Sequence, residues 1–419
     1  MIKIKPFKGL YYTDKSTKSN NLSRVVCPPY DIISDEQKAE LKSKNQFNAV
    51  NLEAPDSYEE AKKSLDDWIK NKILTFDEAP SMYIYEISYK VNNETYRLKG
   101  IIGSLKLPEK DEDYIISTQN AINDNKIDRI KLLENTNCQF SPVFMLYDDS
   151  ENEIQNLIRT SIKSNYLAKS KQNNIIHKIW KISDPEIINC FEELFKNKTY
   201  YIADGHSRLE AACSYRDRLR KEQNISDDHP ANFIMTFFVD QNNPALTILP
   251  THRIVSNIDM FDSDSMFEQA SQYFDIIRCK TIKSTRNTMF GLRRKNKNAF
   301  GIYTDGCYSV LVLKDDNIMK EISNQSDEYN SLDVAVLHKL FFEKILNIDS
   351  KQITYNKSAN EACECVDNGD ACFAVFLSAT RISEAIDISK NNENMPLNST
   401  LFFPKPMSGF VFYSLNNKI

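Results

Sequence analysis

A polar turn at residues 204–208, with the sequence Asp-Gly-His-Ser-Arg, carries the densest group of side chains in this sequence that could do chemistry. It follows an apolar, β-rich segment at 199–203 and precedes a segment whose apolar residues have helical spacing. Ser207 and Glu210 match a capping box, so the helix is expected to begin at about Arg208. Free N–H groups and the positive end of the helix dipole make such a turn suitable for an anion.

Each residue type in the turn suits a phosphate ligand in a different way. Gly205 lets the backbone approach closely, and Arg208 can pair with phosphate oxygens. His206 can donate a hydrogen bond to a group in transfer, while Asp204 could hold Mg²⁺ or accept a proton. Asp204, His206 and Arg208 are therefore expected to be catalytic. Gly205 and Ser207 are expected to contact the ligand. The alternative interpretation is a capped helix with polar groups at its surface.

Two further pairs of residues are candidates for binding the same ligand. His252-Arg253 follows the apolar segment 245–249, and two His-Arg pairs at strand ends could converge on one anion. The alternative for this pair is a core histidine beside a surface arginine. Asp128-Arg129 is expected to contact the cofactor, or else to form an ion pair between neighbours on a solvated helix.

Composition excludes several other classes of function. With 41% hydrophobic and 11% aromatic residues, the chain of 419 residues can bury a large core, which excludes global disorder. The net charge of -5 disfavours nucleic acid as a partner. The sequence has no Walker A loop, GxGxxG fingerprint or HExxH motif, and its 9 cysteines include no CxxC pair, so no metal site is expected from these motifs.

The sequence also bears on location. Residues 1–6 lack the apolar segment of a signal peptide, and no apolar run approaches the roughly 18 residues that a membrane span requires. Cysteines of odd number and irregular spacing are typical of reduced, intracellular thiols. We therefore expect a cytoplasmic protein that does not associate with membranes. Its oligomeric state is left open.

Expected strands and helices follow one another without a strict β-α-β rhythm, which favours an α+β fold with mixed sheets and flanking helices. Met82–Tyr89 and Thr95–Gly103 have the alternation of a hairpin. Amphipathic spacing predicts helices over 58–74 and 332–346, and a capping box at Ser34 predicts another helix start. Three regions are expected: an N-terminal α+β region at 1–104, a core region with the polar turn at 105–255, and a C-terminal α+β region at 256–419.

Several separated blocks of the chain, in the expected order, resemble a broad bacterial and archaeal family, the domain of unknown function numbered ten-fifteen. The blocks are Val26–Asp31, Lys126–Arg129, Ser141–Phe144, Ile202–Arg208, Leu249–Arg253, Leu332–Leu337 and Ser399–Lys405. Members of that family carry an Ala-Asp-Gly-His-His-Arg box and are related to the ParB/sulfiredoxin superfamily, which also contains nucleotide-dependent kinases of free serine. The resemblance implies a ParB/sulfiredoxin-like nucleotide-binding core at 105–255. The residues that it implies at the nucleotide phosphates are Asp204, Gly205, His206 and Arg208.

The chain departs from the pattern of that family at three positions. Ser207 stands where the box has its second histidine. Gln119, within the segment 118–121, stands where family members carry a glutamate, so any base or metal role at that position is lost. Asn398 stands where the family has a lysine before Ser-Thr.

The turn and the resemblance together predict a nucleotide-dependent phosphotransferase that uses ATP or ADP with Mg²⁺ to phosphorylate a small hydroxylated metabolite, with free L-serine as first choice. Asp204 is the first choice for the carboxylate near the acceptor hydroxyl, followed by Asp128 and then Asp31. The alternative is a non-catalytic, nucleotide-binding regulatory protein, which the three departures favour. A third class is a structural or partner-binding protein.

Overall fold

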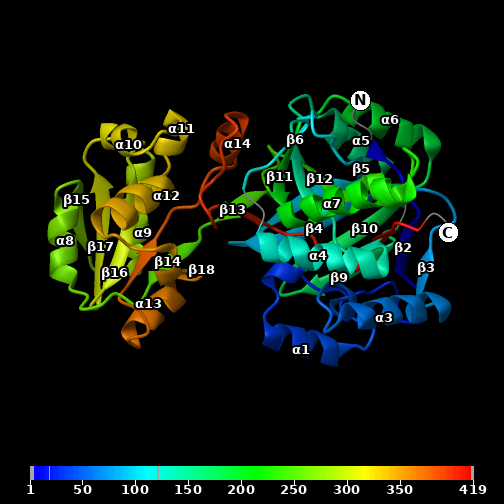
Figure 1. The fold of residues 1–419 in the computed structure, drawn as a ribbon, viewed down its shortest axis with the longest axis horizontal. Helices are drawn as coiled ribbons and strands as arrows, with labels where there is room; N and C mark the ends of the chain where they lie inside the picture. Colours follow the sequence, from blue (N-terminus) through cyan, green and yellow to red (C-terminus); the bar gives the residue numbers. More distant parts are fainter. Residues whose placement is uncertain (1–3, 18, 120–121, 164, 417–419) are drawn as a thin grey trace. The chain divides into compact units, whose positions relative to one another are not determined.

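The structure, a computed structural model, describes residues 4–17, 19–119, 122–163 and 165–416. They form two compact units, unit 1 from Met1–Leu246 with Pro404–Ile419 and unit 2 from Thr247–Phe403 (Figure 1). The units do not coincide with the three expected regions, 1–104, 105–255 and 256–419, because the end of the chain returns to pair with strands of unit 1. The expected α+β class, with mixed sheets and flanking helices, is confirmed. Among the described residues, no helix is both long enough and apolar enough to span a bilayer.

Unit 1 is built on a nine-stranded mixed sheet. Its strands, in spatial order, are β6 (Ile115–Ile116), β11 (Tyr200–Asp204), β8 (Val143–Tyr147), β12 (Phe233–Asp240), β5 (Glu94–Lys106), β4 (Met82–Val91), β10 (Ile175–Ile182) and β9 (Ala168–Gln172), with β1 (Ile4–Lys5) paired to β5. The pairs β6–β11 and β8–β12 are parallel, and the other pairs are antiparallel. β4 and β5 form the expected hairpin, which turns at Asn92 and Asn93 with positive φ at both residues.

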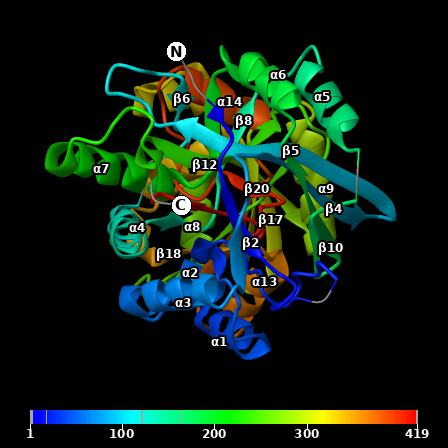
Figure 2. The same ribbon diagram turned by 90° about the vertical axis from the view of Figure 1, so that its right-hand side faces the viewer.

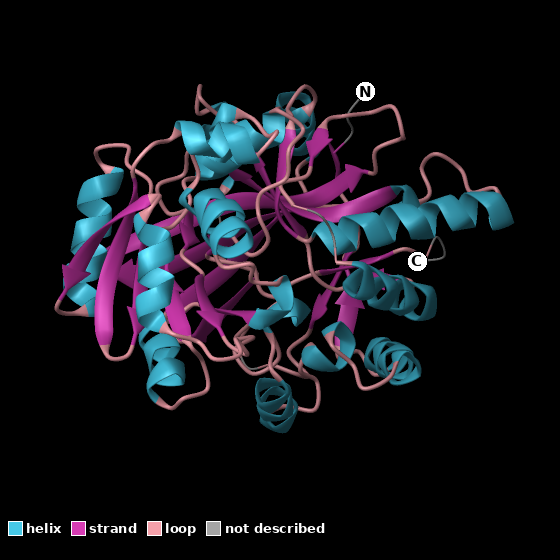
Figure 3. Ribbon diagram, turned by 60° about the vertical axis from the view of Figure 1, so that its left-hand side comes forward, coloured by secondary structure: helices cyan, strands magenta, loops and turns pink. Residues whose placement is uncertain are grey.

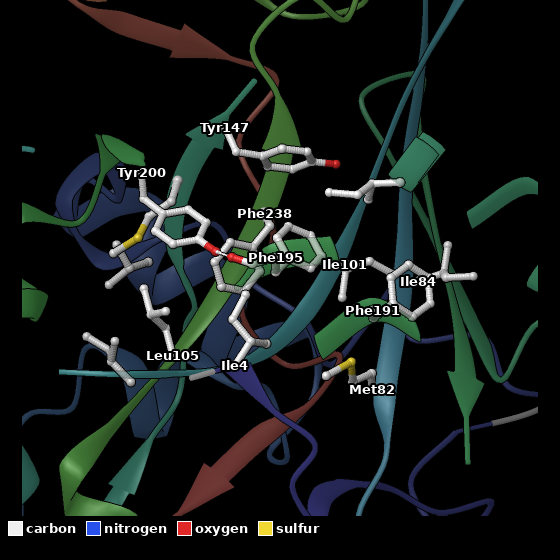
Figure 4. Packing of buried hydrophobic residues seen from close by; sticks show 14 of the residues in the cluster. Ile4, Met82, Ile84, Ile101, Leu105, Tyr147, Phe191, Phe195, Tyr200 and Phe238 are labelled. Carbon is white, nitrogen blue, oxygen red and sulfur yellow. Dashed lines mark hydrogen bonds between the residues drawn. The ribbon is translucent and has the colours of Figure 1, made fainter. Parts of the chain in front are cut away.

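The sheet buries apolar side chains on both faces. Phe237 and Phe238 are neighbours on β12 and therefore point to opposite faces. Phe238 packs against Phe195 with ring centroids 5.1 Å apart, whereas Phe237 packs against Tyr85 at 5.4 Å. Figure 4 shows Phe195 and Phe238 in the first of these two cores, together with Ile101. Burial on both faces makes the sheet the rigid base of unit 1.

A second sheet of unit 1, with four strands, joins distant parts of the chain. Its order is β3 (Leu74–Phe76), β2 (Gly9–Tyr12), β21 (Phe412–Ser414) and β7 (Cys138–Gln139). The helices of unit 1 are α1 (Asp35–Lys44), α2 (Val50–Glu53), α3 (Tyr58–Lys70), α4 (Asn123–Thr136), α5 (Glu153–Ser161), α6 (Pro185–Phe195) and α7 (His206–Gln223), with short turns η1 (Tyr30–Ile32) and η2 (Pro230–Asn232). The expected capping box at Ser34 is present, and α4 and α7 lie side by side (Figures 1 and 2).

Unit 2 contains a six-stranded antiparallel sheet between helices (Figure 3). The sheet has the order β15 (Phe274–Cys279), β17 (Cys307–Leu313), β16 (Ala299–Thr304), β19 (Phe373–Phe376), β14 (His252–Val255) and β18 (Ile353–Asn356), and a separate pair is β13 (Thr247–Leu249) with β20 (Leu401–Phe403). The helices are α8 (Ser263–Ser271), α9 (Ile282–Arg293), α10 (Asn317–Ile322), α11 (Asp327–Asn330), α12 (Asp333–Ala335), η3 (Val336–Ile345), η4 (Ser350–Gln352), α13 (Ala359–Asp367) and α14 (Ile382–Lys390). The helix expected over 332–346 is present, and most of it is the π-helix η3.

The C-terminal segment is anchored to unit 1 by β21. Phe412 is fully buried, with its ring centroid 6.0 Å from that of Tyr12 and 5.4 Å from that of Phe140. Backbone hydrogen bonds between Cys27 and Ser408 fix the same segment closer to residue 404. These contacts set where the segment crosses unit 1.

We expect Phe412→Ala to lower the free energy of unfolding of unit 1 by about 3–5 kcal/mol, because it opens a cavity between packed rings. Urea unfolding followed by tryptophan fluorescence measures this, since both tryptophans, Trp68 and Trp180, lie in unit 1. Ile127→Ala is the control, because that side chain is 52% exposed and its loss should change the value by less than about 0.5 kcal/mol. Equal effects of the two substitutions would contradict the anchoring role of Phe412.

Candidate functional site

The polar turn connects β11 directly to α7. β11 ends at Asp204, Gly205 has φ 98 and ψ 27, and α7 begins at His206. The expected capping box at Ser207 is therefore wrong: Gly205 is the N-cap, and no side chain caps the helix. The left-handed conformation of Gly205 reverses the chain before Ser207 can do so, and the Ser207 hydroxyl instead donates to the Ile122 carbonyl at 3.4 Å.

The start of α7 leaves backbone donors unused. The first intrahelical bond runs from the Leu209 N–H to the Gly205 carbonyl at 3.0 Å. Among the described residues, nothing accepts a hydrogen bond from the backbone N–H groups of residues 206–208. Free amides at the positive end of an 18-residue helix form an anion-binding position.

Two cations hold the carboxylate that precedes this helix. Arg208 Nη2 lies 2.5 Å from Asp204 Oδ2, and Lys405 Nζ lies 2.6 Å from Asp204 Oδ1. Lys405 Nζ also lies 3.1 Å from Asp31 Oδ2. Sequence reasoning did not identify Lys405 as a site residue, although the flanking Pro404 and Pro406, which fix the local backbone, were a signal that this residue is held in place.

The network fixes the charges of its three members. Burial raises the pKa of Asp204, but the Lys405 ammonium and the Arg208 guanidinium outweigh it, so this pKa lies below its usual value. Burial lowers the pKa of Lys405 and of Arg208, but the Asp204 carboxylate outweighs it in both, and both values are raised. Asp204 is therefore a carboxylate, and Lys405 and Arg208 are cations, at neutral pH.

His206 is neutral in this environment. Burial lowers the pKa of His206 to about 4, against the opposing effect of Asp204. Its Nε2 lies 3.2 Å from Thr118 Oγ1, and the Thr118 hydroxyl donates to the Ile202 carbonyl at 2.8 Å. Since that hydroxyl proton is already used, the single N–H of the neutral ring is on Nε2 and donates to Thr118. His206 thus offers Nδ1 as an acceptor, not the donor that the sequence suggested.

Arg208 is oriented by hydrogen bonds to Ser141 and Pro142, and its Nε donor has no partner. Its Nη1 donates to Ser141 Oγ at 3.0 Å and to the Pro142 carbonyl at 2.5 Å, and Ser141 Oγ in turn donates to Glu53 Oε1 at 2.8 Å. Arg208 Nε is buried without a hydrogen-bond partner. A Cβ added at Gly205 would lie 3.0 Å from this Nε. A buried unpaired donor is costly, which favours an acceptor at this position when a ligand binds.

Asp128 and Arg129 lie on α4, and Arg129 lines the same small cavity as Arg208. Arg129 Nε donates to Asp128 Oδ2 at 2.8 Å, and the guanidinium lies 3.9 Å from the ring centroid of Tyr30. The expected ion pair between these neighbours is present; Arg129 is buried, whereas the Asp128 side chain is 38% exposed and accepts from the Tyr58 hydroxyl at 2.8 Å, so only one member of the pair is solvated. A cavity of about 40 Å³ between Arg129 and Arg208 holds little more than water, too small for a nucleotide base.

The other expected pair, His252-Arg253, belongs to unit 2; it follows the strand β13, as expected, and begins β14. His252 Nδ1 accepts from the Leu377 N–H at 3.4 Å, and Arg253 Nε lies 3.3 Å from His338 Nε2. The proposed convergence of this pair with the turn on one anion stays a prediction.

The three departures fall in different places. Gln119 follows Thr118, the partner of His206, while residues 120–121 lie outside the described residues. Ser207 lies in the first turn of α7, and Asn398 has φ 54 in a loop of unit 2. In the part of the chain that the structure describes, no group of three or more His, Cys, Asp or Glu side chains could hold a metal ion.

Solved structures that match the chain do so at low sequence identity and low TM-score. A free serine kinase mutant in complex with AMP has a TM-score of 0.36 and 10% identity over 73% of this chain and 87% of that chain. SbnI with a C-terminal truncation from Staphylococcus aureus has a TM-score of 0.36 and 9% identity, and the match covers 76% of this chain and 90% of that chain. A conserved hypothetical protein from Pyrococcus furiosus has a TM-score of 0.34 and 10% identity, and the match covers 72% of this chain and 93% of that chain.

At the level of sequence, no curated protein matches the chain significantly. A family model does match, over residues 4–335, and its description is "Protein of unknown function (DUF1015)". The match begins with the first described strand and runs through the polar turn into unit 2. The chain therefore belongs to the DUF1015 family.

Proposed function

We propose that the chain is a nucleotide-dependent phosphotransferase that acts on a small hydroxylated metabolite, with free L-serine as first choice and ATP or ADP as donor. The observation that carries this proposal is the uncapped start of α7 beside the Lys405–Asp204–Arg208 network. It combines free amides, two fixed cations and one carboxylate, the three kinds of group that phosphoryl transfer requires.

Phosphate oxygens would bind where the backbone N–H groups of residues 206–208 point. Arg208 Nε, buried and unpaired, supplies a further donor, and phosphate oxygens would compete with Asp204 for Nη2, while Nη1 stays on Ser141 and the Pro142 carbonyl. Lys405 can turn toward a phosphate oxygen without losing both carboxylates, because Asp31 and Asp204 share its ammonium. These charges stabilise negative charge that develops on the transferred group.

In the transfer step, the acceptor hydroxyl oxygen forms a bond to the terminal phosphorus. The bond between that phosphorus and the bridging oxygen breaks, so the nucleotide leaves with one phosphate fewer. Asp204 accepts the hydroxyl proton, since its low pKa keeps it a carboxylate until the transfer. His206 Nδ1 is an additional acceptor that can orient the hydroxyl.

Asp31 and Asp204 also fit Mg²⁺, because a magnesium ion bound with nucleotide phosphates needs only one or two protein carboxylates. In the structure the Lys405 ammonium lies between these two carboxylates, so the position already accepts a cation. Mg²⁺ would neutralise phosphate charge there.

The choice of serine rests on the sequence resemblance to a superfamily that contains kinases of free serine. A second candidate, a regulatory protein that binds nucleotide without turnover, is favoured by Gln119, an amide where the family has a carboxylate. The two candidates share the phosphate position and differ only in whether transfer follows binding.

We expect Gly205→Ala to weaken ADP binding by at least about ten-fold, because the new Cβ costs about 1–3 kcal/mol of strain at φ 98 and displaces Arg208. Isothermal titration calorimetry measures this, with tryptophan fluorescence as the check of folding. Gly369→Ala is the matched control, since its φ is 80 and a Cβ there meets nothing within 4 Å. Unchanged ADP affinity in Gly205→Ala would place the phosphates elsewhere.

With ATP or ADP, Mg²⁺ and L-serine, we expect phosphorus NMR to record O-phosphoserine. Asp204→Asn should lower its rate of formation by at least about 100-fold, because the proton acceptor is lost. Arg218→Gln should leave the rate unchanged, since Arg218 lies on the same helix but pairs at the surface with Glu134.

The outcomes separate the candidates. Phosphorylation of another hydroxylated metabolite but not of serine keeps the phosphotransferase and removes the serine assignment. Saturable nucleotide binding without transfer to any acceptor supports the regulatory protein. Absence of nucleotide binding would overturn both.

A further inference from the structure

Unit 2 contains a cavity of about 450 Å³, within the size range of small-molecule sites. Its walls come from five segments and Ser399: 250–253 before and within β14, 293–298 at and after the end of α9, 316–320 at α10, 327–334 around α11 and α12, and 377–384 before and within α14. The elements α9, α11, α12 and α14 are labelled in Figure 1. The lining residues all belong to unit 2, and none of them holds the proposed phosphate position.

The charged residues of these walls are only partly paired. Arg293 Nη2 lies 3.0 Å from Glu384 Oε2, and Lys320 Nζ lies 3.0 Å from Asp327 Oδ1. The other charged residues in the walls include cations and carboxylates that make no ion pair with any described residue: Arg253, Lys297, Asp316 and Asp333. The cavity thus has unpaired charges of both signs.

Asp333 is the unpaired carboxylate nearest the protein interior. Its Oδ1 accepts from Asn298 Nδ2 at 3.0 Å and from the Ala299 N–H at 3.2 Å, and no described residue donates to its Oδ2. Burial raises the pKa of Asp333 to about 6, in spite of those two hydrogen bonds. At neutral pH the group is therefore mostly a carboxylate; the Arg293 guanidinium lowers its pKa from a distance, but no described cation forms an ion pair with it.

Arg253 is the corresponding unpaired cation. It is 1% exposed, and its guanidinium donates to three uncharged acceptors, the Thr251 and Leu397 carbonyls and His338 Nε2. Burial lowers the pKa of Arg253 to about 10, which still leaves it charged at neutral pH. A buried charge without a counter-ion is unfavourable, and in a medium of low dielectric it attracts an anion from beyond contact distance.

We propose that this cavity binds a small zwitterion, a molecule that carries one carboxylate and one ammonium group. The ammonium would pair with Asp333 Oδ2, and the carboxylate would be attracted by two cations that line the same cavity, Lys297, whose side chain is exposed, and Arg253. A plain anion would leave Asp333 unpaired and be repelled by it, and a plain cation would leave the basic side unpaired. The inference is independent of the proposed phosphotransfer.

The test is calorimetric titration of the full chain at neutral pH with a series of ω-amino acids, from glycine to 5-aminopentanoate, which varies the distance between the two charges. Propionate and propylamine carry one charge each. We expect one chain length to bind best, with a dissociation constant at least about ten-fold below those of both single-charge probes.

Asp333→Asn and Lys297→Met should each weaken that best binder by at least about ten-fold. Asn keeps the acceptor for Asn298, and Lys297 makes no contact that folding needs. The matched controls are Asp370→Asn and Lys283→Met, at exposed residues outside the cavity. Both variants should bind the zwitterion as the unchanged chain does. Arg208→Lys should also retain zwitterion binding, which separates this site from the nucleotide site.

Three results would overturn the proposal: no binding by any member of the series, equal binding by a single-charge probe, or unchanged binding in both cavity variants. Absence of nucleotide binding by the unchanged chain, with zwitterion binding intact, would instead count against the proposed function alone.

Discussion

The ion network on Asp204 is the constraint on which the site depends. Lys405 and Arg208 occupy one oxygen each of this buried carboxylate, and they come from the two separate stretches of chain that make up unit 1. Removing either cation would leave part of a buried charge uncompensated, which costs several kcal/mol. The same cations stand beside free backbone N–H groups at the start of α7, so the network both holds the turn together and gives it a positive local field.

Local patterns predicted local structure well. The hairpin of β4 and β5 and the capping box at Ser34 follow from residue spacing, because the interactions that form them lie within a few residues. The start of α7 was misplaced because Ser207 fits a cap equally well by sequence, and only the left-handed φ of Gly205 decides between them. The π-helical form of η3 is set by packing, which no periodicity reveals.

Long-range contacts escaped prediction. Lys405 is separated by about 200 residues from Asp204 in the sequence, and what brings it there is the pairing of β21 with β2. The same pairing explains why unit 1 contains both Met1–Leu246 and Pro404–Ile419. The pair His252-Arg253 has the residue types of an anion site, as expected, but it lies in unit 2, where Arg253 has no counter-ion among the described residues. The sequence thus indicated which residue types could bind an anion, but not which of these residues lie together in the folded chain.

The central claim is that phosphate oxygens compete with Asp204 for Lys405 and Arg208. Titration of ADP without Mg²⁺ into Asp204→Asn and Lys405→Met tests it directly. The account predicts that Lys405→Met binds ADP more weakly. Asp204→Asn should bind ADP at least about five-fold more tightly, because Lys405 and Arg208 are released and the repulsion between the Asp204 carboxylate and the phosphates, about 1 kcal/mol, is removed. Weaker or unchanged binding of ADP by Asp204→Asn would contradict it.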